Sequence, residues 1–267
     1  MILGFLDPVA FHLFSKPVYW YGIIIATTVF FAYLLADREA TKRGLKQDTM
    51  LDLLLIALPI AFIFARAYYV IFRWEYYAGD FSSMIAIWDG GIAIYGGLIG
   101  GFLVLYFFAR RRGVKIIKLL DIIAPSLLVG QMLGRWGNFF NHEAYGEIVT
   151  KQYLENRFIP NFIIENMYID GAYRQPTFLY ESLWCLIALV ILLLIRNKLA
   201  QSEVFAAYLI LYGVERFIVE GMRTDSLYIG SLRVSQVLSL VFVVGSLIYL
   251  VVLNTKFKDK KILYRES

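Results

Sequence analysis

Long apolar stretches separated by short polar connections run along the whole chain of 267 residues. Three stretches contain no charged side chain, and four more contain one or a few ionisable residues. In chain order, the seven stretches cover residues 18–36, 50–72, 92–109, 116–135, 177–195, 203–220 and 234–253. Because a helix of about 20 mostly apolar residues crosses the hydrocarbon core of a bilayer, the pattern predicts about seven transmembrane α-helices.

The composition supports this interpretation. Hydrophobic residues make up 60% of the chain, charged residues only 18%, and the mean hydropathy is +0.64. Soluble domains contain about 45–50% apolar and about 25% charged residues, so this composition indicates a membrane protein. A β-barrel would need short segments of alternating polarity, which the sequence does not show. We therefore expect an all-α integral membrane protein with one polytopic transmembrane domain over residues 1–267.

The basic residues predict the orientation. Four connections, "DREATKRGLKQ", "RRRGVKIIK", "RNK" and "KFKDKKILYR", hold 16 of the 26 Lys and Arg residues. Since positively charged loops stay in the cytoplasm, we expect the N-terminus outside, the C-terminus cytoplasmic, and connections 73–90, 136–176 and 221–233 on the outer face. The net charge of +5 then reflects topology and anionic inner-leaflet lipid, and no nucleic-acid partner is expected.

Two segments outside the spans are distinctive. Residues 1–17 lack the basic start of a cleavable signal peptide, so we expect them to lie at the outer interface as an amphipathic lead-in. The connection at about 140–176 is long, mixed in polarity and aromatic, which favours a small ordered subdomain on the outer face. The single cysteine, Cys185, lies within a span and is expected to pack as a small hydrophobic residue.

Ionisable residues at membrane depth are few and costly, at about 2.5–3.5 kcal/mol each at a helix centre, so they should face the protein interior or water. For four of them, mutual ion pairing is the favoured interpretation: Asp52, Arg66, Asp121 and Glu181.

The stretch "GRWGNFFNHEAYG" is harder to explain by pairing alone. Arg135 and Asn138 are spaced i, i+3 and share a helix face, while Glu143 and Gly146 follow in the turn that leaves the membrane. An arginine at a helix end commonly extends to lipid phosphates, which is the simpler alternative. That alternative does not require asparagines and a glutamate around the guanidinium group, so we favour a ligand site.

A second polar group lies in "LYGVERFIVEGMR". Arg216 and Glu220 are spaced i, i+4 and can meet as a simple ion pair. Alternatively, Glu220 orients Arg216 so that its guanidinium fork binds a phosphate or carboxylate. Both polar stretches are predicted at the outer face, and two arginines that converge in a lipid-accessible hollow near the outer headgroups would suit an anionic phospholipid.

The third feature is the glycine-rich stretch "IYGGLIGG". Gly96 and Gly97 allow close helix contact, and packing alone would explain them. The phenol of Tyr95 could lie in the same cavity as the arginines, and Tyr21 in the first span is a similar candidate. For both tyrosines, a place in the aromatic belt at the membrane surface is an equally good interpretation.

Taken together, four stretches resemble the prolipoprotein diacylglyceryl transferase family of the bacterial envelope. "GRWGNFFNHEAYG", "IYGGLIGG", "QPTFLYES" and "RFIVEGMR" are similar to four of the family's sequence blocks, in the same order and with similar spacing. The similarity extends from the first to the last predicted span. The resemblance implies a multi-pass protein of the bacterial plasma membrane with its active site toward the outer face.

The resemblance also implies the reaction and the residues. The family transfers a diacylglyceryl group from phosphatidylglycerol to the lipobox cysteine of a preprolipoprotein and releases glycerol phosphate, without a cofactor. It implies that Arg135 binds the phospholipid with Asn138 and Gly146, and that Gly96 and Gly97 contribute to the substrate site. Catalytic roles are implied for a second set: Arg216, Glu220, Tyr95, Glu143 and Tyr21.

One position departs from the family pattern. Many members have His before the GGLIG stretch, where this chain has Tyr95. The base for the thiol is therefore left open between Tyr95 and Glu143, and His142 is a weaker third option because loop histidines are commonly solvated. No metal site is expected, since two histidines, one cysteine and scattered carboxylates have no ligand spacing. A transporter for anionic solutes and a lipid-binding scaffold are the alternative functions.

Overall fold

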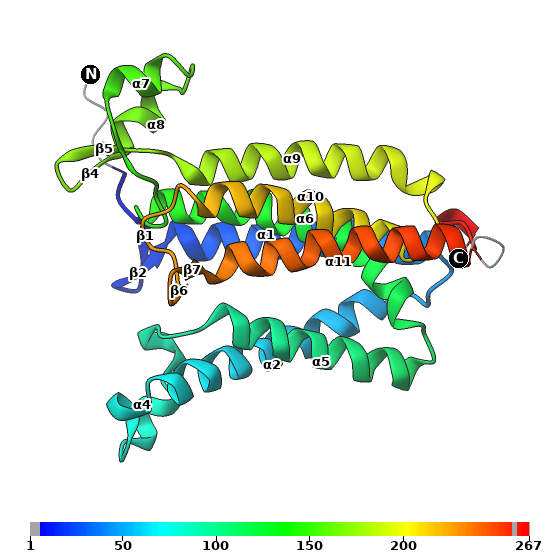
Figure 1. Cartoon of the computed structure of the whole chain (residues 1–267). Coiled ribbons are helices and arrows are strands. Elements are labelled where there is room, and N and C mark those ends of the chain that lie inside the picture. Colours follow the sequence, from blue (N-terminus) through cyan, green and yellow to red (C-terminus); the bar gives the residue numbers. More distant parts are fainter. Residues whose placement is uncertain (1–5, 258–260, 267) are drawn as a thin grey trace. The chain divides into compact units, whose positions relative to one another are not determined.

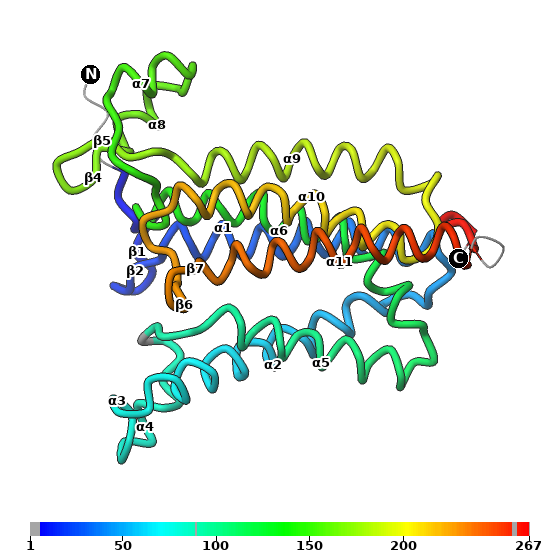
Figure 2. Tube along the Cα trace, viewed as in Figure 1, coloured from blue at the N-terminus to red at the C-terminus, as the bar shows by residue number. Residues whose placement is uncertain are grey.

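The structure, a computed structural model, describes residues 6–257 and 261–266, and Figures 1 and 2 show the order of its elements. Six of the described helices are long and apolar enough to cross a membrane. They are α1 (Trp20–Lys42), α2 (Thr49–Phe72), α5 (Ile94–Arg112), α6 (Ile116–Phe140), α9 (Thr177–Ile195) and α11 (Val234–Lys256). The prediction of an all-α integral membrane protein is therefore confirmed.

The stretch expected as the sixth span forms α10 (Glu203–Glu220), with the predicted bounds. This helix carries four charged residues, and it is not among the helices whose composition alone suits a membrane. Its neighbours along the chain, α9 and α11, both pack against it. The count of seven spans and their orientation stay predictions.

Of the helices that extend beyond the apolar stretches that predicted them, α1 and α6 extend furthest. The first was expected to end at residue 36, but α1 continues to Lys42 through half of the expected basic loop. The reason is that "DREATK" contains no glycine or proline, and the first glycine after it, Gly44, has a φ of +70°. Similarly, α6 runs to Phe140 instead of 135, so Arg135 and Asn138 both lie on regular helix.

The described part also contains small antiparallel sheets that the sequence did not predict. The expected lead-in at the N-terminus includes a hairpin of β1 (Val9–Leu13) and β2 (Lys16–Tyr19), so its described part is not a helix. A second hairpin, β6 (Tyr228–Ile229) and β7 (Leu232–Arg233), precedes α11. Strands this short have no alternating pattern long enough to recognise in a sequence.

The expected subdomain at 140–176, which we call the head segment, is ordered. It contains a three-stranded sheet in the order β3 (Ile148–Val149), β5 (Ala172–Arg174), β4 (Tyr168–Ile169) and two short helices, α7 (Lys151–Glu155) and α8 (Asn161–Asn166). Its own apolar core combines residues of the head segment and the adjoining helix ends: Phe139, Leu154, Ile159, Ile163, Ile164, Met167, Ile169 and Phe178. Its place on the outer face of a membrane stays a prediction.

Contacts divide the chain into two compact units, and whether they form one domain stays a prediction. The first unit comprises Met1–Leu35 and Ile123–Ser267, the second Ala36–Ile122. In the first unit, Cys185 is buried in an apolar cluster with Leu128, Leu192 and Tyr208, as expected for a small hydrophobic residue. In the same unit, η2 (Arg196–Lys198) follows α9 and contacts η4 (Tyr264–Glu266) near the C-terminus, where Tyr264 is buried.

The second unit is built on α2 and α5, joined by α3 (Trp74–Tyr77), α4 (Phe81–Ile85) and η1 (Ile87–Asp89). Asp52 pairs with Arg112 in the last turn of α5, an arginine outside the set of residues that were expected to pair with one another. The prediction of an acidic partner for Arg66 is wrong. Its guanidinium group instead donates to four backbone carbonyls in the connection between α2 and α5, at 2.6 to 3.0 Å. These carbonyls belong to Ser83, Met84, Gly90 and Gly91.

Close packing of α2 on α5 explains one of the glycines assigned to the substrate site. A Cβ atom on Gly96 would overlap the carbonyl oxygen of Phe64 and lie 2.5 Å from Cβ of Tyr68. Gly97 is less crowded, with Ala61 O and Ala65 Cβ both 3.7 Å from such an atom. Helix packing therefore accounts for Gly96, and a role for either glycine in binding substrate stays a prediction.

We expect Gly96→Ala to destabilise the second unit because the new methyl group forces α2 and α5 apart, at a cost of about 1–3 kcal/mol. Gly101→Ala on the same helix is the matched control, since no atom lies within 4 Å of its added methyl group. Thermal unfolding of both purified variants in detergent checks this. Equal melting temperatures for the two variants would contradict the packing explanation.

Candidate functional site

The polar residues at the end of α6 form a connected chain. Arg135 Nη1 lies 3.4 Å from Asn138 Oδ1, in a long hydrogen bond that confirms the shared face predicted from their spacing. The Asn138 amide donates to Glu143 Oε1 at 2.9 Å, and the Asn141 amide lies 3.5 Å from the same oxygen. Both asparagines thus fix the carboxylate of Glu143 beside the arginine.

The centre of the site is Glu181 on α9. Its carboxylate, with a side chain only 2% exposed, lies 2.5 Å from Arg135 Nη2, 3.3 Å from Arg216 Nη1 and 3.7 Å from Arg223 Nη1. These arginines come from α6, from α10 and from the turn after α10. Arg135 is therefore paired within the protein, which an arginine that merely extends to surrounding lipid phosphates would not require.

Arg216 also forms the predicted pair with Glu220, with Nη2 and Oε2 2.6 Å apart and the glutamate side chain 2% exposed. We call these five residues, Arg135, Glu181, Arg216, Glu220 and Arg223, the arginine network. The predicted convergence of two arginines is confirmed, but around one shared carboxylate. The lipid-accessible hollow beside them stays a prediction.

Arg223 extends the arginine network to the protein surface. Its Nε and Nη2 atoms donate to both carboxylate oxygens of Asp225, at 3.0 and 2.8 Å. Partial burial raises the pKa of Asp225, but the hydrogen bonds and charge of Arg223 outweigh it and hold that pKa below its usual value. Asp225 is therefore a carboxylate at neutral pH, and its two oxygens hold the Nε and Nη2 edge of the Arg223 guanidinium group in one orientation.

Tyr21 joins this site across a helix crossing. A Cβ atom on Gly137 would lie 2.8 Å from Cδ2 of Tyr21. The ring of Tyr21, on α1, therefore packs directly against the backbone of α6 at Gly137. The Tyr21 phenol interacts electrostatically with Glu143 and Arg135. Tyr21 therefore lies close to Arg135 and Glu143, as expected if it belongs to the site. The absence of a side chain at Gly137 permits this approach.

Gly146 lies where three segments of backbone meet. It forms a β-bridge with Arg223, and its N–H donates to Gln175 O at 2.9 Å. An added Cβ atom would lie 2.8 Å from Gln175 Cβ and 3.1 Å from Met222 O. Gly146 thus ties the turn that bears Arg223 to the segment preceding α9, while direct contact with a substrate stays a prediction.

Two other titratable groups lie nearby. Glu215 on α10 is 2% exposed, and neither carboxylate oxygen has a hydrogen-bond partner among the described residues. It interacts electrostatically with Glu181 and with all three arginines. His142, beyond the end of α6, is half-buried, and burial lowers its pKa, which keeps the ring neutral at pH 7.

The remaining candidates, Tyr95, Gly96 and Gly97, lie at the start of α5 in the second unit. Their predicted meeting with the arginine network stays a prediction. Sequence reasoning missed the central role of Glu181 and any role for Arg223. The signal for both was present, because "TFLYES" and "RFIVEGMR" contain them. Among the described residues, no three His, Cys, Asp or Glu side chains gather as a metal site would require.

Helical spans, an ordered head segment and a buried network of arginines and glutamates define a polytopic membrane protein. Comparison with known proteins gives its family. The model of a family described as prolipoprotein diacylglyceryl transferase matches residues 8–252. The chain is 55% identical over 256 residues to the phosphatidylglycerol--prolipoprotein diacylglyceryl transferases of Bacillus cereus (strain Q1) and Bacillus anthracis, covering 94% of this chain and 95% of each relative. The chain belongs to the prolipoprotein diacylglyceryl transferase family of enzymes.

We expect Glu181→Gln to lower the free energy of unfolding by about 3–5 kcal/mol, because it leaves buried arginines without their shared countercharge. Glu215→Gln is the matched control: it is the same change at an equally buried glutamate whose carboxylate accepts no hydrogen bond from the described part of the chain. It should change stability much less, because no hydrogen bond or ion pair to the described residues is lost. Denaturant titration in mixed micelles measures both. An unstable Glu215→Gln beside a stable Glu181→Gln would contradict this assignment.

Proposed function

We propose that this chain transfers the diacylglyceryl group of phosphatidylglycerol to the lipobox cysteine thiol of a preprolipoprotein and releases glycerol phosphate. Membership of the family and the names of the relatives support the reaction and both substrates. The observation that carries the proposal is the convergence of Arg135 and Arg216 on the Glu181 carboxylate. A pair of oriented guanidinium groups is the arrangement that binds a phosphodiester.

The reaction is a displacement at the glycerol C3 carbon of the lipid. The thiol S–H bond breaks, a C–S bond forms, and the C–O bond to phosphate breaks so that glycerol phosphate leaves with the electron pair. The thiol proton passes to a base or to water. Because a free thiol has a pKa of about 8.5, the enzyme must also favour the thiolate.

In this proposal the arginines assist both the departure of glycerol phosphate and the formation of the thiolate. Glu181 and Glu220 hold the Arg216 fork in one orientation, and Glu181 with Asn138 does the same for Arg135. The guanidinium groups then bind the phosphate and offset the charge that builds up on it as the C–O bond breaks. The same positive charge favours a thiolate nearby. Glu143, fixed by Asn138, and Tyr95 remain the two proposed proton acceptors.

Both alternative functions lack this kind of support. A transporter site would lie near mid-depth between discontinuous helices. Here Arg135 is within two turns of the C-terminal end of α6, Glu181 is near the N-terminal end of α9, and Arg216 is near the C-terminal end of α10. A scaffold that only binds lipid would not explain a chain that resembles transferases along nearly its whole length. The transferase is the function we propose.

We propose that the site faces outward, at the plasma membrane of a bacterium. In the first unit, the head segment and the small sheets lie at one end of the helices, and the C-terminal segments lie at the other (Figure 1). The arginine network occupies the end with the head segment. The basic connections after α9 and α11 adjoin the opposite end, which is the cytoplasmic side by the positive-inside rule.

We expect Arg135→Ala to lower transfer at least a hundredfold, because the phosphodiester loses a charged, bidentate partner. The purified variant is incubated with phosphatidylglycerol and a lipobox peptide, and the mass of the peptide is measured. Arg110→Ala, at an exposed arginine in the last turn of α5, is the control and should be fully active. Near-normal lipidation by Arg135→Ala would show that the phosphate is bound elsewhere.

Tyr95→Phe tests the choice of base. Loss of the phenol removes a proton acceptor but keeps the ring, so a base role predicts a large fall in kcat that is relieved as pH rises toward the pKa of the thiol. Glu143→Gln is measured in parallel with the same peptide assay. We expect one of the two variants to show this pH-dependent loss. If both retain normal kcat across the pH range, the thiolate forms without either residue.

A further inference from the structure

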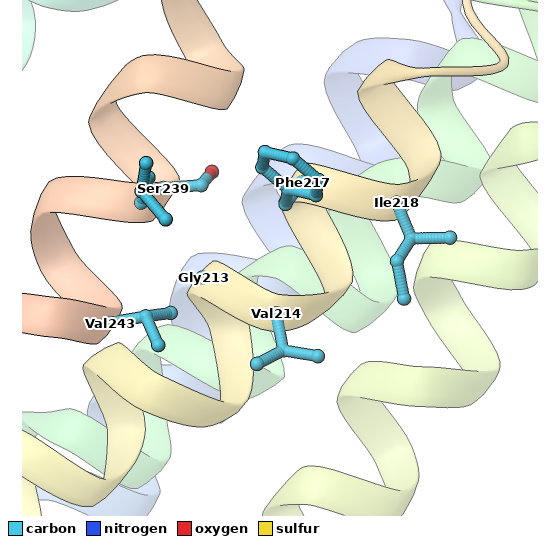
Figure 3. Close-up of a pocket in the computed structure, with 7 residues that line it drawn as sticks. Gly213, Val214, Phe217, Ile218, Ser239 and Val243 are labelled. Atoms are coloured by element: carbon cyan, nitrogen blue, oxygen red, sulfur yellow. The ribbon is translucent and has the colours of Figure 1, made fainter. Parts of the chain in front are cut away.

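An open groove between α10 and α11 (Figure 3) is apolar apart from Ser239, whose hydroxyl group donates to Ser235 O at 2.7 Å within α11. Such a lining does not identify a particular ligand. Arg66 on α2, in the second unit, makes far more specific contacts. We propose that Arg66 is a positioning residue that fixes the start of α5 and hence Tyr95, an inference that rests on the proposed function, in which Tyr95 is a candidate proton acceptor.

All three guanidinium nitrogens of Arg66 donate to backbone carbonyls of the connection between α2 and α5. Nε donates to Met84 O at 3.0 Å, and Nη2 donates to Ser83 O at 2.6 Å. Nη1 donates to two successive carbonyls, that of Gly90 at 2.6 Å and that of Gly91 at 2.8 Å. A planar guanidinium group with five N–H donors can join four carbonyls at once, which the ammonium group of a lysine cannot do.

Gly91 allows the backbone to come this close to the guanidinium group. Its φ is +68°, and a Cβ atom there would lie 2.6 Å from Arg66 Nη1, so a side chain at this position would be both strained and crowded. Arg66 also contacts an aromatic ring, since its Cζ atom lies 5.0 Å from the ring centroid of Tyr77 in α3. Arg66 therefore holds three parts of the connection together: α3, residues 83–84 and residues 90–91.

These contacts continue to the start of α5. The Ala93 N–H donates at 3.0 Å to the carbonyl oxygen of Ala65, which precedes Arg66 in the sequence. Three residues later, Gly96 packs so closely against α2 that an added Cβ atom would lie 2.9 Å from Cα of Ala65. Tyr95 lies between these two contacts, in the first turn of α5. Its backbone is therefore held on both sides by the part of α2 that carries Arg66.

A fixed start of α5 matters if Tyr95 takes a proton from the thiol. A proton acceptor must lie within hydrogen-bonding reach of its partner, and a displacement of about 1 Å can lower a rate about a hundredfold. Tyr95 follows the connection 73–93, which is long enough to adopt other arrangements if nothing holds it. The hydrogen bonds of Arg66 restrict that connection before substrate binds. In this role Arg66 acts through Tyr95.

The first test is a double-mutant cycle. Arg66→Lys keeps the charge but loses most of the hydrogen bonds, so we expect kcat to fall about tenfold while the KM for phosphatidylglycerol changes less than about twofold. In a Tyr95→Phe background, the same change should lower kcat by less than about twofold, because the phenol that Arg66 positions is already absent. Arg73→Lys, at an exposed arginine directly after α2, is the control and should be fully active.

Three outcomes of this cycle would overturn the proposal. A normal kcat for Arg66→Lys would show that the contacts are not needed, and losses that multiply in the double variant would show that Arg66 acts independently of Tyr95. A normal kcat for Tyr95→Phe would leave no function for Arg66 to support. In each case the wild-type protein still lipidates the peptide, so the transferase function stands. A wild-type protein that lipidates no peptide would instead reject the transferase function.

A second pair of variants changes the same contact from the side of the connection. Gly91→Ala places a methyl group against Arg66 Nη1, whereas Gly90→Ala meets no atom within 4 Å. Both glycines have a positive φ, +68° and +82°, so both changes strain the backbone and only one displaces Arg66. We expect Gly91→Ala to speed hydrogen exchange at 92–97 and to lower kcat about tenfold, with a smaller effect of Gly90→Ala. Equal exchange and equal kcat for the two folded variants would overturn the proposal.

Discussion

The buried carboxylate of Glu181 is the interaction on which the site depends. Three guanidinium groups from separate segments converge on it, and each would be costly to bury alone. Because the partners come from α6, from α10 and from the turn after α10, one side chain on α9 fixes the relative positions of all of them. A ligand that approaches the arginines meets a charged surface whose geometry is already set, so little reorganisation is required when an anion binds.

Close backbone approach makes that convergence possible. Gly137 lets the ring of Tyr21 rest on α6 two residues from Arg135, and Gly146 lets three backbone segments meet beside Arg223. Both glycines matter because they have no side chain: a methyl group at either position would collide with a neighbouring residue. The charged side chains can therefore approach one another because glycines stand near them in the sequence. The glycines and the charged residues together form the site.

Much of the fold could be predicted from the sequence, because apolar length and helix periodicity are local signals. The bounds of α9 and α10 were predicted to the residue, and so was the pairing of Arg216 with Glu220, which depends only on spacing within one helix. The predictions that were wrong or missing concern contacts between segments that are far apart in the sequence. The carbonyl partners of Arg66 and the convergence on Glu181 join residues distant in the chain, and no periodicity reveals which of several buried charges will meet.

The composition of α10 has a consequence for how the protein is made. This helix presents an apolar groove on one side and carries Glu215, Arg216 and Glu220 in its last two turns. A segment with that many ionisable groups partitions poorly into lipid by itself. Arg216 is paired with Glu181 of the preceding helix as well as with Glu220, and Glu203 at the start of α10 is bound by Lys261 and by Asn254 of α11. If α10 spans the membrane as predicted, we therefore expect it to enter the bilayer together with α9 and α11, whose side chains pair with part of its charge.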